Sequence, residues 1–577
     1  MGILTTSAVV IPLLILAFTL HSLVCLLRNY LVARKLGVPV RIIPVDHINP
    51  LWYLFNQQVA ALLRKLPFGL GDNNITKYNY LGFEIPLRWK SHQEMGDAFV
   101  LCSPARNWLY LGNPDIITAM LKRNNDFPHD SELTAMLDVF GPNISTASDE
   151  AVAENFRLPV LTSLPQAQGA DWKKMRKLIA SCFVDQNFEI VWQESIAQAV
   201  DMGRYWGSRQ SVETVAHDTR TLSLNVMSMA GFGKSFPFKG HHEAQIALKG
   251  TSLSYKEALQ TILENSIVIM VLGTKFLAKP WLPRYFKDLH NACFSFQGYM
   301  TELLEAGKMK SSQTMVSDRN LMDSLVRTSH GDSSTSLTER EIYGNMFVFN
   351  FAGHDTTAHT FVWVMYFLAG NPEVQDWLYE EILHVMGDRP QSDWNYKEDL
   401  PRLKRCMSVL FESLRLYTPV GLAKWTGENS TTLQVGEKTL VIPPRTMVVP
   451  SNASTQTDPA YWGSDSLTWR PSRWIKPGVS GSEDIDGEEL ITPVRGTFLS
   501  WSDGARDCLG KKLSQVEAVA TIAALFKDWR VDPVTKQGED LGEARERVLR
   551  FIEEDTGIVL LLQMLHPERC PLVWKRR

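Results

Sequence analysis

The sequence lacks several features that mark common classes of protein. Its seven cysteines are odd in number, widely spread and without a CxxC pair, which argues against a disulfide framework or a zinc site and for reduced thiols. The formal net charge is only −4 and there is no long basic run, so nucleic acid is not expected as a partner. No internal repeat and no dinucleotide-binding GxGxxG motif occurs, so the chain is not expected to bind a nicotinamide or flavin dinucleotide itself.

One long hydrophobic run is present near the N-terminus. AVVIPLLILAFTLHSLVCLL begins at Ala8, and its roughly 20 residues suffice to cross a hydrocarbon core of about 30 Å. Basic residues from Arg28 to Arg41 follow it, which places the main body in the cytosol by the positive-inside rule. A buried core helix is the alternative interpretation. We expect a spanning helix over about 8–27 within an anchor of residues 1–30, a proline-containing connector over 31–50, and a catalytic domain over 51–577.

The pattern after residue 337 predicts one long, apolar helix. A capping box opens it at Thr338, and the apolar run continues to Gly370. At its centre AGHDTT, residues 352–357, places Asp355 and Thr356 in apolar surroundings. Burying such groups unpaired costs about 1–3 kcal/mol each. Two interpretations stay open on these residues alone: a satisfied polar network in the core, or a functional notch.

The next predicted helix, LKRCMSVLFESLRLYTP, carries Glu412 and Arg415 three residues apart on one face. On a solvated face such a pair is commonplace and worth a few tenths of a kcal/mol, so ExxR by itself is a weak signal. Strand-like stretches follow, and then WRPSRW offers Arg473. A charged cluster of these three residues is therefore a hypothesis.

A lone cysteine, Cys508, lies between Gly504 and Gly510 in WSDGARDCLG, just before a long predicted helix. Glycines permit tight turns close to a flat group, and the positive end of a helix favours a thiolate. A thiolate can ligate haem iron. Arg506 is spaced to meet a haem propionate. The usual interpretation of one cysteine is a buried apolar thiol, and the glycine and arginine context argues against it here.

Taken together, these motifs resemble those of the cytochrome P450 superfamily of haem-thiolate monooxygenases, from about residue 50 to about residue 565. The resemblance rests on DWKKMR, AGHDTT, FESLR, WRPSRW and WSDGARDCLG, which occur in the family's order. It implies a mainly α fold with small β-sheets, the cytochrome P450 fold, preceded by one N-terminal transmembrane helix. Trp501 is a small departure, since the family more often has phenylalanine there.

The resemblance also implies a role for each matching residue. Cys508 would ligate the iron of haem b (iron protoporphyrin IX) through its thiolate, and Asp355 and Thr356 would relay protons during oxygen activation. The other residues would bind or support the cofactor: Trp172, Arg176 and Arg506 at the propionates, Glu412, Arg415 and Arg473 as a buried triad, and Gly504 and Gly510 in the cysteine loop.

The activity implied is insertion of one oxygen atom from O2 into a lipophilic small molecule, because the residues expected to line the pocket, such as Met346 and Phe349, are apolar. Electrons would come from NADPH through a membrane-bound NADPH-cytochrome P450 reductase, with cytochrome b5 as a second candidate donor. The expected protein is a monomer in the endoplasmic reticulum membrane, single-pass, with a cytosolic catalytic domain.

The chain looks most like fungal members that act in secondary-metabolite biosynthesis, on terpenoids, polyketides or alkaloids. A fatty-acid or sterol hydroxylase is the alternative, and a non-redox haem-thiolate isomerase or a haem-binding sensor is less favoured. One segment, Asp149 to Gln168, interrupts the family pattern. It is either a loop near the pocket mouth or, as its length favours, an intron left in the gene prediction.

Overall fold

The structure is a computed structural model that describes residues 2–129, 137–147, 172–240, 253–311, 320–328, 336–478 and 484–577. The chain divides into two compact units. The first comprises Met1–Asp130, Val420–Thr468 and Pro493–Asp507, and the second comprises Ser131–Pro419, Trp469–Thr492 and Cys508–Arg577. The expected domain boundaries at residues 30 and 50 stay a prediction, and the insert at residues 149–168 lies outside the described residues.

A five-stranded sheet organises the first unit. Its strands, in spatial order, are β1 (Val40–Ile42), β2 (Ala98–Cys102), β3 (Asn107–Leu111), β7 (Met447–Pro450) and β4 (Lys424–Trp425). β2 and β3 are antiparallel and buried along their whole length, and β3 pairs in parallel with β7. β1 arises from the stretch expected as a connector and pairs in parallel with β2. The sheet therefore joins chain segments more than 300 residues apart.

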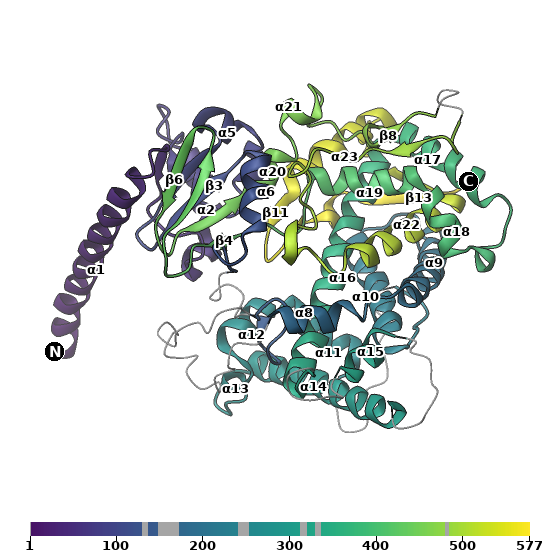
Figure 1. Cartoon of the computed structure of the whole chain (residues 1–577), viewed down its shortest axis with the longest axis horizontal. Coiled ribbons are helices and arrows are strands. Elements are labelled where there is room, and N and C mark those ends of the chain that lie inside the picture. The colour runs from purple at the N-terminus through teal and green to yellow at the C-terminus, as the bar shows by residue number, and fades with distance from the viewer. Residues whose placement is uncertain are drawn as a thin grey trace. The chain divides into compact units, whose positions relative to one another are not determined.

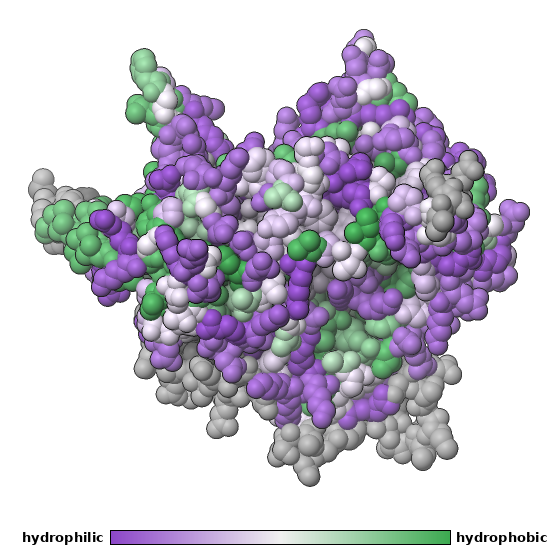
Figure 2. Space-filling view, turned by 45° about the horizontal axis from the view of Figure 1, so that its top comes forward, coloured by the Kyte–Doolittle hydropathy of each residue, from purple (hydrophilic) through white to green (hydrophobic). Residues whose placement is uncertain are grey.

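The N-terminal helix α1 (Gly2–Arg34) carries an apolar segment, Leu13–Arg34, that is long and apolar enough to cross a membrane. Most of its large apolar side chains are exposed, whereas Ala33 near its end is buried in the hydrophobic core of the first unit. The helix projects from the sheet of its own unit (Figure 1), and Figure 2 shows its hydrophobic side chains at the surface. The other elements of this unit include α2 (Pro50–Arg64), α3 (Asn74–Tyr78), α4 (Glu84–Leu87), α5 (Lys90–Met95), α6 (Pro114–Lys122), the hairpin β5 (Thr431–Val435) and β6 (Lys438–Ile442), α20 (Asn452–Thr455), α21 (Pro459–Trp462) and η6 (Gly504–Arg506).

The long helix predicted from the capping box is confirmed as α16 (Glu339–Gly370), which runs through the second unit (Figure 1). The Thr338 hydroxyl accepts a bond from the Glu341 N–H at 3.3 Å, and the Glu341 carboxylate accepts one from the Thr338 N–H at 2.7 Å. Most of its side chains are buried because other helices cover it. These are α10 (Val215–Phe232), α14 (Arg284–Ser311), α15 (Leu321–Arg327), α17 (Pro372–Met386), α19 (Lys404–Leu416), α22 (Lys511–Asp528) and α23 (Leu541–Asp555).

A second long contact joins α22 to α9 (Asp185–Gly207). Two glycines of α9 permit this close approach. A Cβ on Gly203 would stand 3.0 Å from Leu525 of α22, and one on Gly207 would overlap the ring of Trp529, the residue that follows α22, at 2.0 Å. Further helices of this unit are α8 (Trp172–Ala180), α11 (Tyr255–Glu264), α12 (Ser266–Leu272), α13 (Thr274–Leu277), α18 (Tyr396–Asp399), η3 (Gln391–Asp393), η4 (Leu400–Arg402), η5 (Pro471–Trp474) and η7 (Pro567–Arg569). Its strands form pairs: β8 (Ile475–Lys476) with β9 (Glu489–Leu490), β10 (Trp529–Pro533) with β13 (Leu572–Arg576), and β11 (Thr556–Ile558) with β12 (Leu562–Met564).

Candidate active site

None of the seven cysteines forms a disulfide, and Cys508 is the exposed one. Burial raises the pKa of Cys182 and of Cys293 to about 12, which keeps those thiols protonated and inert. Cys508 lies three residues before α22, and its carbonyl accepts a bond from the Lys511 N–H, the first of that helix, at 3.4 Å. The thiol therefore lies at the positive end of a helix, where a ligand can reach it.

The two glycines of the cysteine loop have different roles. Gly504 has φ +80°, and a Cβ there would meet the Leu121 carbonyl oxygen at 2.7 Å, so only glycine fits. Gly510 lies in the expected tight turn, which the Lys511 N–H closes on the Cys508 carbonyl, but its φ of −77° is one that other residues also adopt. A Cβ on Gly510 would stand 3.7 Å from the Cys508 sulfur, so glycine leaves the space beside the sulfur open.

The charged cluster suggested by ExxR and WRPSRW is present and buried. Arg415 donates to both carboxylate oxygens of Glu412, through Nε and a terminal nitrogen, each at 2.8 Å, and Arg473 Nε donates to Glu412 Oε1 at 2.8 Å. Glu412 and Arg415 are 0% exposed and Arg473 is 5% exposed. The commonplace alternative, an exposed ion pair, is therefore wrong.

Two further donors complete this cluster, and the sequence analysis missed both. The Arg470 N–H donates to Glu412 Oε1 at 2.9 Å, and the Trp474 indole N–H donates to Oε2 at 2.9 Å. Both come from the WRPSRW segment, which thus closes over the end of α19. The carboxylate accepts five hydrogen bonds, enough to hold a charge out of water.

At the centre of α16, the AGHDTT stretch combines close packing with polar groups. A Cβ on Gly353 would stand 2.8 Å from the Met227 sulfur, so the glycine admits a side chain of α10. The Thr356 and Thr357 hydroxyls donate to the carbonyls of Ala352 and Gly353 at 2.8 and 3.1 Å. Ala352 is exposed although it lies in the middle of a buried helix. The stretch therefore presents small residues and one hydroxyl to open space.

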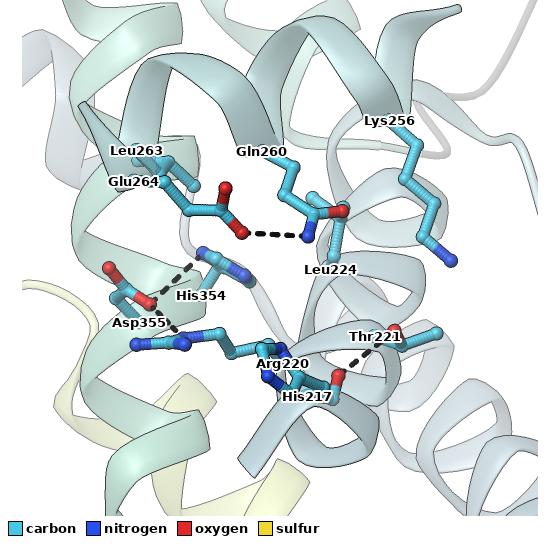
Figure 3. A pocket seen from close by; sticks show the side chains of 10 residues that line it. All are labelled: His217, Arg220, Thr221, Leu224, Lys256, Gln260, Leu263, Glu264, His354 and Asp355. Carbon is cyan, nitrogen blue, oxygen red and sulfur yellow. Dashed lines mark hydrogen bonds and ion pairs between the residues drawn. The ribbon is translucent and has the colours of Figure 1, made fainter. Parts of the chain in front are cut away.

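Asp355 lies within a cluster of basic groups (Figure 3). Arg220 Nε of α10 donates to Asp355 Oδ1 at 3.1 Å, and His354 Nδ1 and His359 Nε2 each lie 3.9 Å from that oxygen. Burial alone would raise the pKa of Asp355, but His354, His359 and Arg220 together lower it. Burial lowers the pKa of His354 to about 4 and of His359 to about 3, so Arg220 is the charge that faces Asp355 at neutral pH.

Trp172 and Arg176 lie one turn apart on α8. The Arg176 guanidinium stands 5.8 Å from the centre of the Trp172 ring, and Trp172 is buried. Between them, Met175 accepts a hydrogen bond from the buried Asn345 of α16 at 3.6 Å. This contact fixes α8 against the central helix.

Arg506 belongs to a group of basic side chains in the first unit. Burial and the charge of Arg506 lower the pKa of Lys424 to about 7, and burial, Lys424 and Arg506 lower that of His129 to about 3. Lys424 is 2% exposed, and among the described residues its ammonium has no hydrogen-bond partner. A buried ammonium without a partner is unfavourable, and an anionic group would relieve it. The sequence analysis missed Lys424 and His129.

Each unit carries residues that suit one part of a haem-thiolate site. The second unit offers an accessible thiol at a helix N-terminus, small residues at the middle of α16 and a neutralised charge cluster. The first unit offers basic groups suited to the carboxylates of haem. Met346 and Phe349, expected at the substrate pocket, are buried in α16, and the Phe349 ring packs edge-on against Phe183.

Comparisons with known proteins agree with these features. A model of the family described as Cytochrome P450 matches residues 88–554. A cytochrome P450 monooxygenase of Arthrobotrys oligospora is 24% identical over 563 residues, covering 91% of each chain. One of Penicillium roqueforti is 25% identical over 561 residues, covering 92% of each. A phomenoic acid biosynthesis cluster cytochrome P450 monooxygenase of Leptosphaeria maculans is 27% identical over 584 residues, covering 92% of this chain and 93% of the relative.

Proposed function

The chain belongs to the cytochrome P450 family, whose members are oxidoreductases that incorporate oxygen, and we propose that it is a membrane-anchored monooxygenase acting on a lipophilic small molecule. One observation carries the proposal: Cys508 is exposed at the start of α22 while five other cysteines are buried. An accessible thiolate at a helix N-terminus is what a haem-thiolate enzyme requires.

Haem iron bound to a thiolate supplies the redox chemistry that activates O2. The chain's own residues would hold the group and handle protons. Cys508 would bind the iron and Arg506 and Lys424 would hold carboxylates, while the Glu412 cluster fixes the segments at the end of α19. Thr356, whose hydroxyl donates to the Ala352 carbonyl, is partly open, and the preceding Asp355 is ionised, so these two residues of α16 are the proposed proton-handling groups.

The substrate class is proposed to be a fungal secondary metabolite, a terpenoid, polyketide or alkaloid. The name of the Leptosphaeria relative places that protein in a biosynthetic gene cluster, which supports this class over a fatty acid or sterol. The described part of α16 contributes apolar side chains on either side of the polar centre, which suits a lipophilic molecule.

NADPH-cytochrome P450 reductase is the proposed electron donor, with cytochrome b5 as a second. Lys511 and Lys512 are exposed at the start of α22, close along the chain to Cys508, and Lys173 and Lys177 are exposed on α8. Such positive charges suit an acidic partner. Lys511→Glu with Lys512→Glu should raise the reductase concentration that gives half-maximal turnover by about tenfold, the effect of ~1.4 kcal/mol. Lys279→Glu, at an exposed lysine two residues after α13, is the control.

The endoplasmic reticulum membrane, crossed once with the catalytic part in the cytosol, is the proposed location. The apolar helix α1 supports this, as does α2, where Phe55 and Leu62 are exposed two turns apart; Leu66 and Phe68, beyond the helix, are also exposed. Alkaline extraction of microsomes should leave the full chain in the membrane, and protease added to sealed microsomes should digest the catalytic part. Protection of that part would reverse the proposed orientation.

The thiolate is tested by the spectrum of the reduced carbon-monoxide complex. Wild type and the control Cys25→Ser should show the red-shifted Soret band of a thiolate trans to CO, and Cys508→Ser should lose it. Retention of the band in Cys508→Ser would overturn the assignment.

Monooxygenation is tested by incubating the protein, reductase, NADPH and 18O2 with a lipophilic fungal extract. Products that gain one 18O atom only when NADPH is present support the proposal. Binding of a compound from the extract without NADPH-dependent oxidation favours a sensor.

A further inference from the structure

The last turns of α1 are built into the first unit. Ala33 is 0% exposed and Leu36, just beyond the helix, is 5% exposed, and both belong to the same hydrophobic core as Val100 of β2. Only residues 35–39 separate α1 from β1, and the carbonyl of Pro39 in that stretch accepts a bond from the Val100 N–H at 2.8 Å. The apolar helix and the sheet therefore fold as one body.

Hydrogen bonds also join α1 to the connection between β2 and β3, which we call the β2–β3 turn, residues 103–106. The side-chain amide of Asn29 donates to the carbonyl oxygens of Ser103 and Pro104 at 3.0 and 3.1 Å. In return, the side-chain amide of Asn107 donates to the Asn29 carbonyl oxygen at 3.1 Å. The helix therefore cannot slide or rotate against the sheet without losing these bonds.

The helix enters the unit at the end of the sheet that carries this turn. Asn29 lies level with Ser103, just after β2 ends, whereas Pro39 lies level with Val100 inside that strand. Between these two residues the chain thus passes from the turn toward the opposite end of the strands. The part of α1 that precedes Asn29 therefore extends beyond the turn, and Figure 1 shows the helix projecting from the sheet.

The expected membrane boundary falls at the same place. The apolar run ends at Leu27, and Arg28 is the first charged residue of the sequence when histidine is counted as neutral. The roughly 20 residues before Arg28, at about 1.5 Å each, span about 30 Å, the thickness of a hydrocarbon core. Arg28 is exposed, as are Arg34 and Lys35, which follow within roughly 10 Å along the helix. Positive side chains at this depth are attracted to the phosphates and anionic headgroups of a bilayer.

α2 starts from the same end of the sheet. Asp46, four residues before α2, accepts bonds from the Ser103 hydroxyl at 2.8 Å and from the Trp108 indole N–H at 3.1 Å. Phe55 and Leu62 of α2 are exposed, and exposed apolar side chains suit the interface of a membrane. Two elements with exposed apolar side chains, α1 and α2, are therefore attached at the β2–β3 turn.

We propose that the β2–β3 turn rests on the phospholipid headgroups of the membrane, held there by its rigid junction with α1. Ala105 of the turn is exposed, and the Arg106 side chain is 22% exposed. The inference rests on the proposed membrane location and goes beyond it. A loose connector would leave the first unit free to rotate above the membrane, whereas this junction fixes which end of the sheet faces the bilayer.

Photocrosslinking to lipid tests the contact in the full-length holoenzyme, reconstituted in bilayer discs of phosphatidylcholine and phosphatidylserine. A photoreactive amino acid in place of Ala105 should form several-fold more phospholipid adducts, counted by mass spectrometry, than the same amino acid in place of Asp97. Asp97 is exposed at the opposite end of β2, about 17 Å away for five residues at about 3.3 Å each. An equal yield of adducts at the two positions would overturn the proposal.

The junction is tested by the double variant Asn29→Ala with Asn107→Ala, and separately by Ala33→Glu, which places a charge in the hydrophobic core. Both should lower the adduct yield at position 105 toward the yield at position 97, because the helix can then move against the sheet. The control Asn429→Ala, at an exposed asparagine of the same unit, should leave the yield unchanged. The thiolate spectrum of each variant is recorded first, so that a folding defect is recognised. Unchanged yields in both junction variants would refute the role of the junction.

Failure of the membrane location itself gives a different result. A wild-type chain that alkaline extraction removes from microsomes would refute the anchor. A chain that stays in the membrane while position 105 gives no excess of lipid adducts over position 97 would refute only the contact of the β2–β3 turn. Adducts to protein instead of lipid at position 105 would assign the turn to another partner and would also overturn the proposal.

Discussion

Replacing Glu412 by glutamine should strongly destabilise the protein although the two side chains have the same shape. The carboxylate accepts five hydrogen bonds from Arg415, Arg473, Arg470 and Trp474. The amide nitrogen of glutamine would face donors, and the guanidinium groups of Arg415 and Arg473, at most 5% exposed, would lose their counter-charge. Breaking a buried pair in this way costs about 3–5 kcal/mol, a large share of the roughly 5–15 kcal/mol by which proteins are stable.

The assay is urea unfolding of the haem-free and haem-loaded full chain, followed by tryptophan fluorescence and haem absorbance. The control is Glu489→Gln, which removes an ion pair with Lys476 in which both side chains are about 70% exposed. An exposed pair is worth about 0–1 kcal/mol, so the control should shift the midpoint little. If Glu412→Gln destabilises the protein no more than Glu489→Gln, the reasoning that the cluster is a buried, charge-neutralised support is refuted.

Three further predictions concern single residues. Thr356→Ala should keep the fold and the thiolate spectrum but divert NADPH oxidation to peroxide, as peroxide assays can measure; equal coupling would remove Thr356 from the relay. Lys424→Met should stabilise the haem-free protein below pH 7 but weaken its retention of haem. A residue with a purely structural role would not change these two properties in opposite directions. Because the pKa of Lys424 falls from 10.5 to about 7 on folding, the unfolded chain binds more protons between these values, so wild-type stability rises with pH across that window and the variant should lose this slope. Gly353→Ala should lower the free energy of unfolding by about 1–3 kcal/mol through overpacking, and the better helix propensity of alanine should offset up to about 1 kcal/mol of that loss. A double-mutant cycle with Met227→Ala should show coupling between the two positions, and additive effects would contradict the contact.

Features that depend on neighbours along the chain were predicted well from the sequence. The capping box at Thr338 and the apolar run to Gly370 placed both ends of α16, because caps and periodicity act within a turn or two. The apolar run near the N-terminus indicated a membrane span for the same reason. The cysteine loop was recognisable because glycine, arginine and cysteine occur within a few residues of one another, and family membership followed from several such local motifs in order.

Tertiary structure decided which distant groups meet. Only packing shows that Gly353 receives Met227, that Arg220 rather than a water-exposed side chain holds Asp355, and that Trp474 and the Arg470 backbone complete the Glu412 cluster. Lys424 carries no local signal at all. Its lowered pKa comes from burial and from Arg506, 82 positions away, and burial is a property of the folded chain. A residue's type and spacing limit what chemistry it can do, but desolvation and the nearest charges are set by segments that meet only on folding.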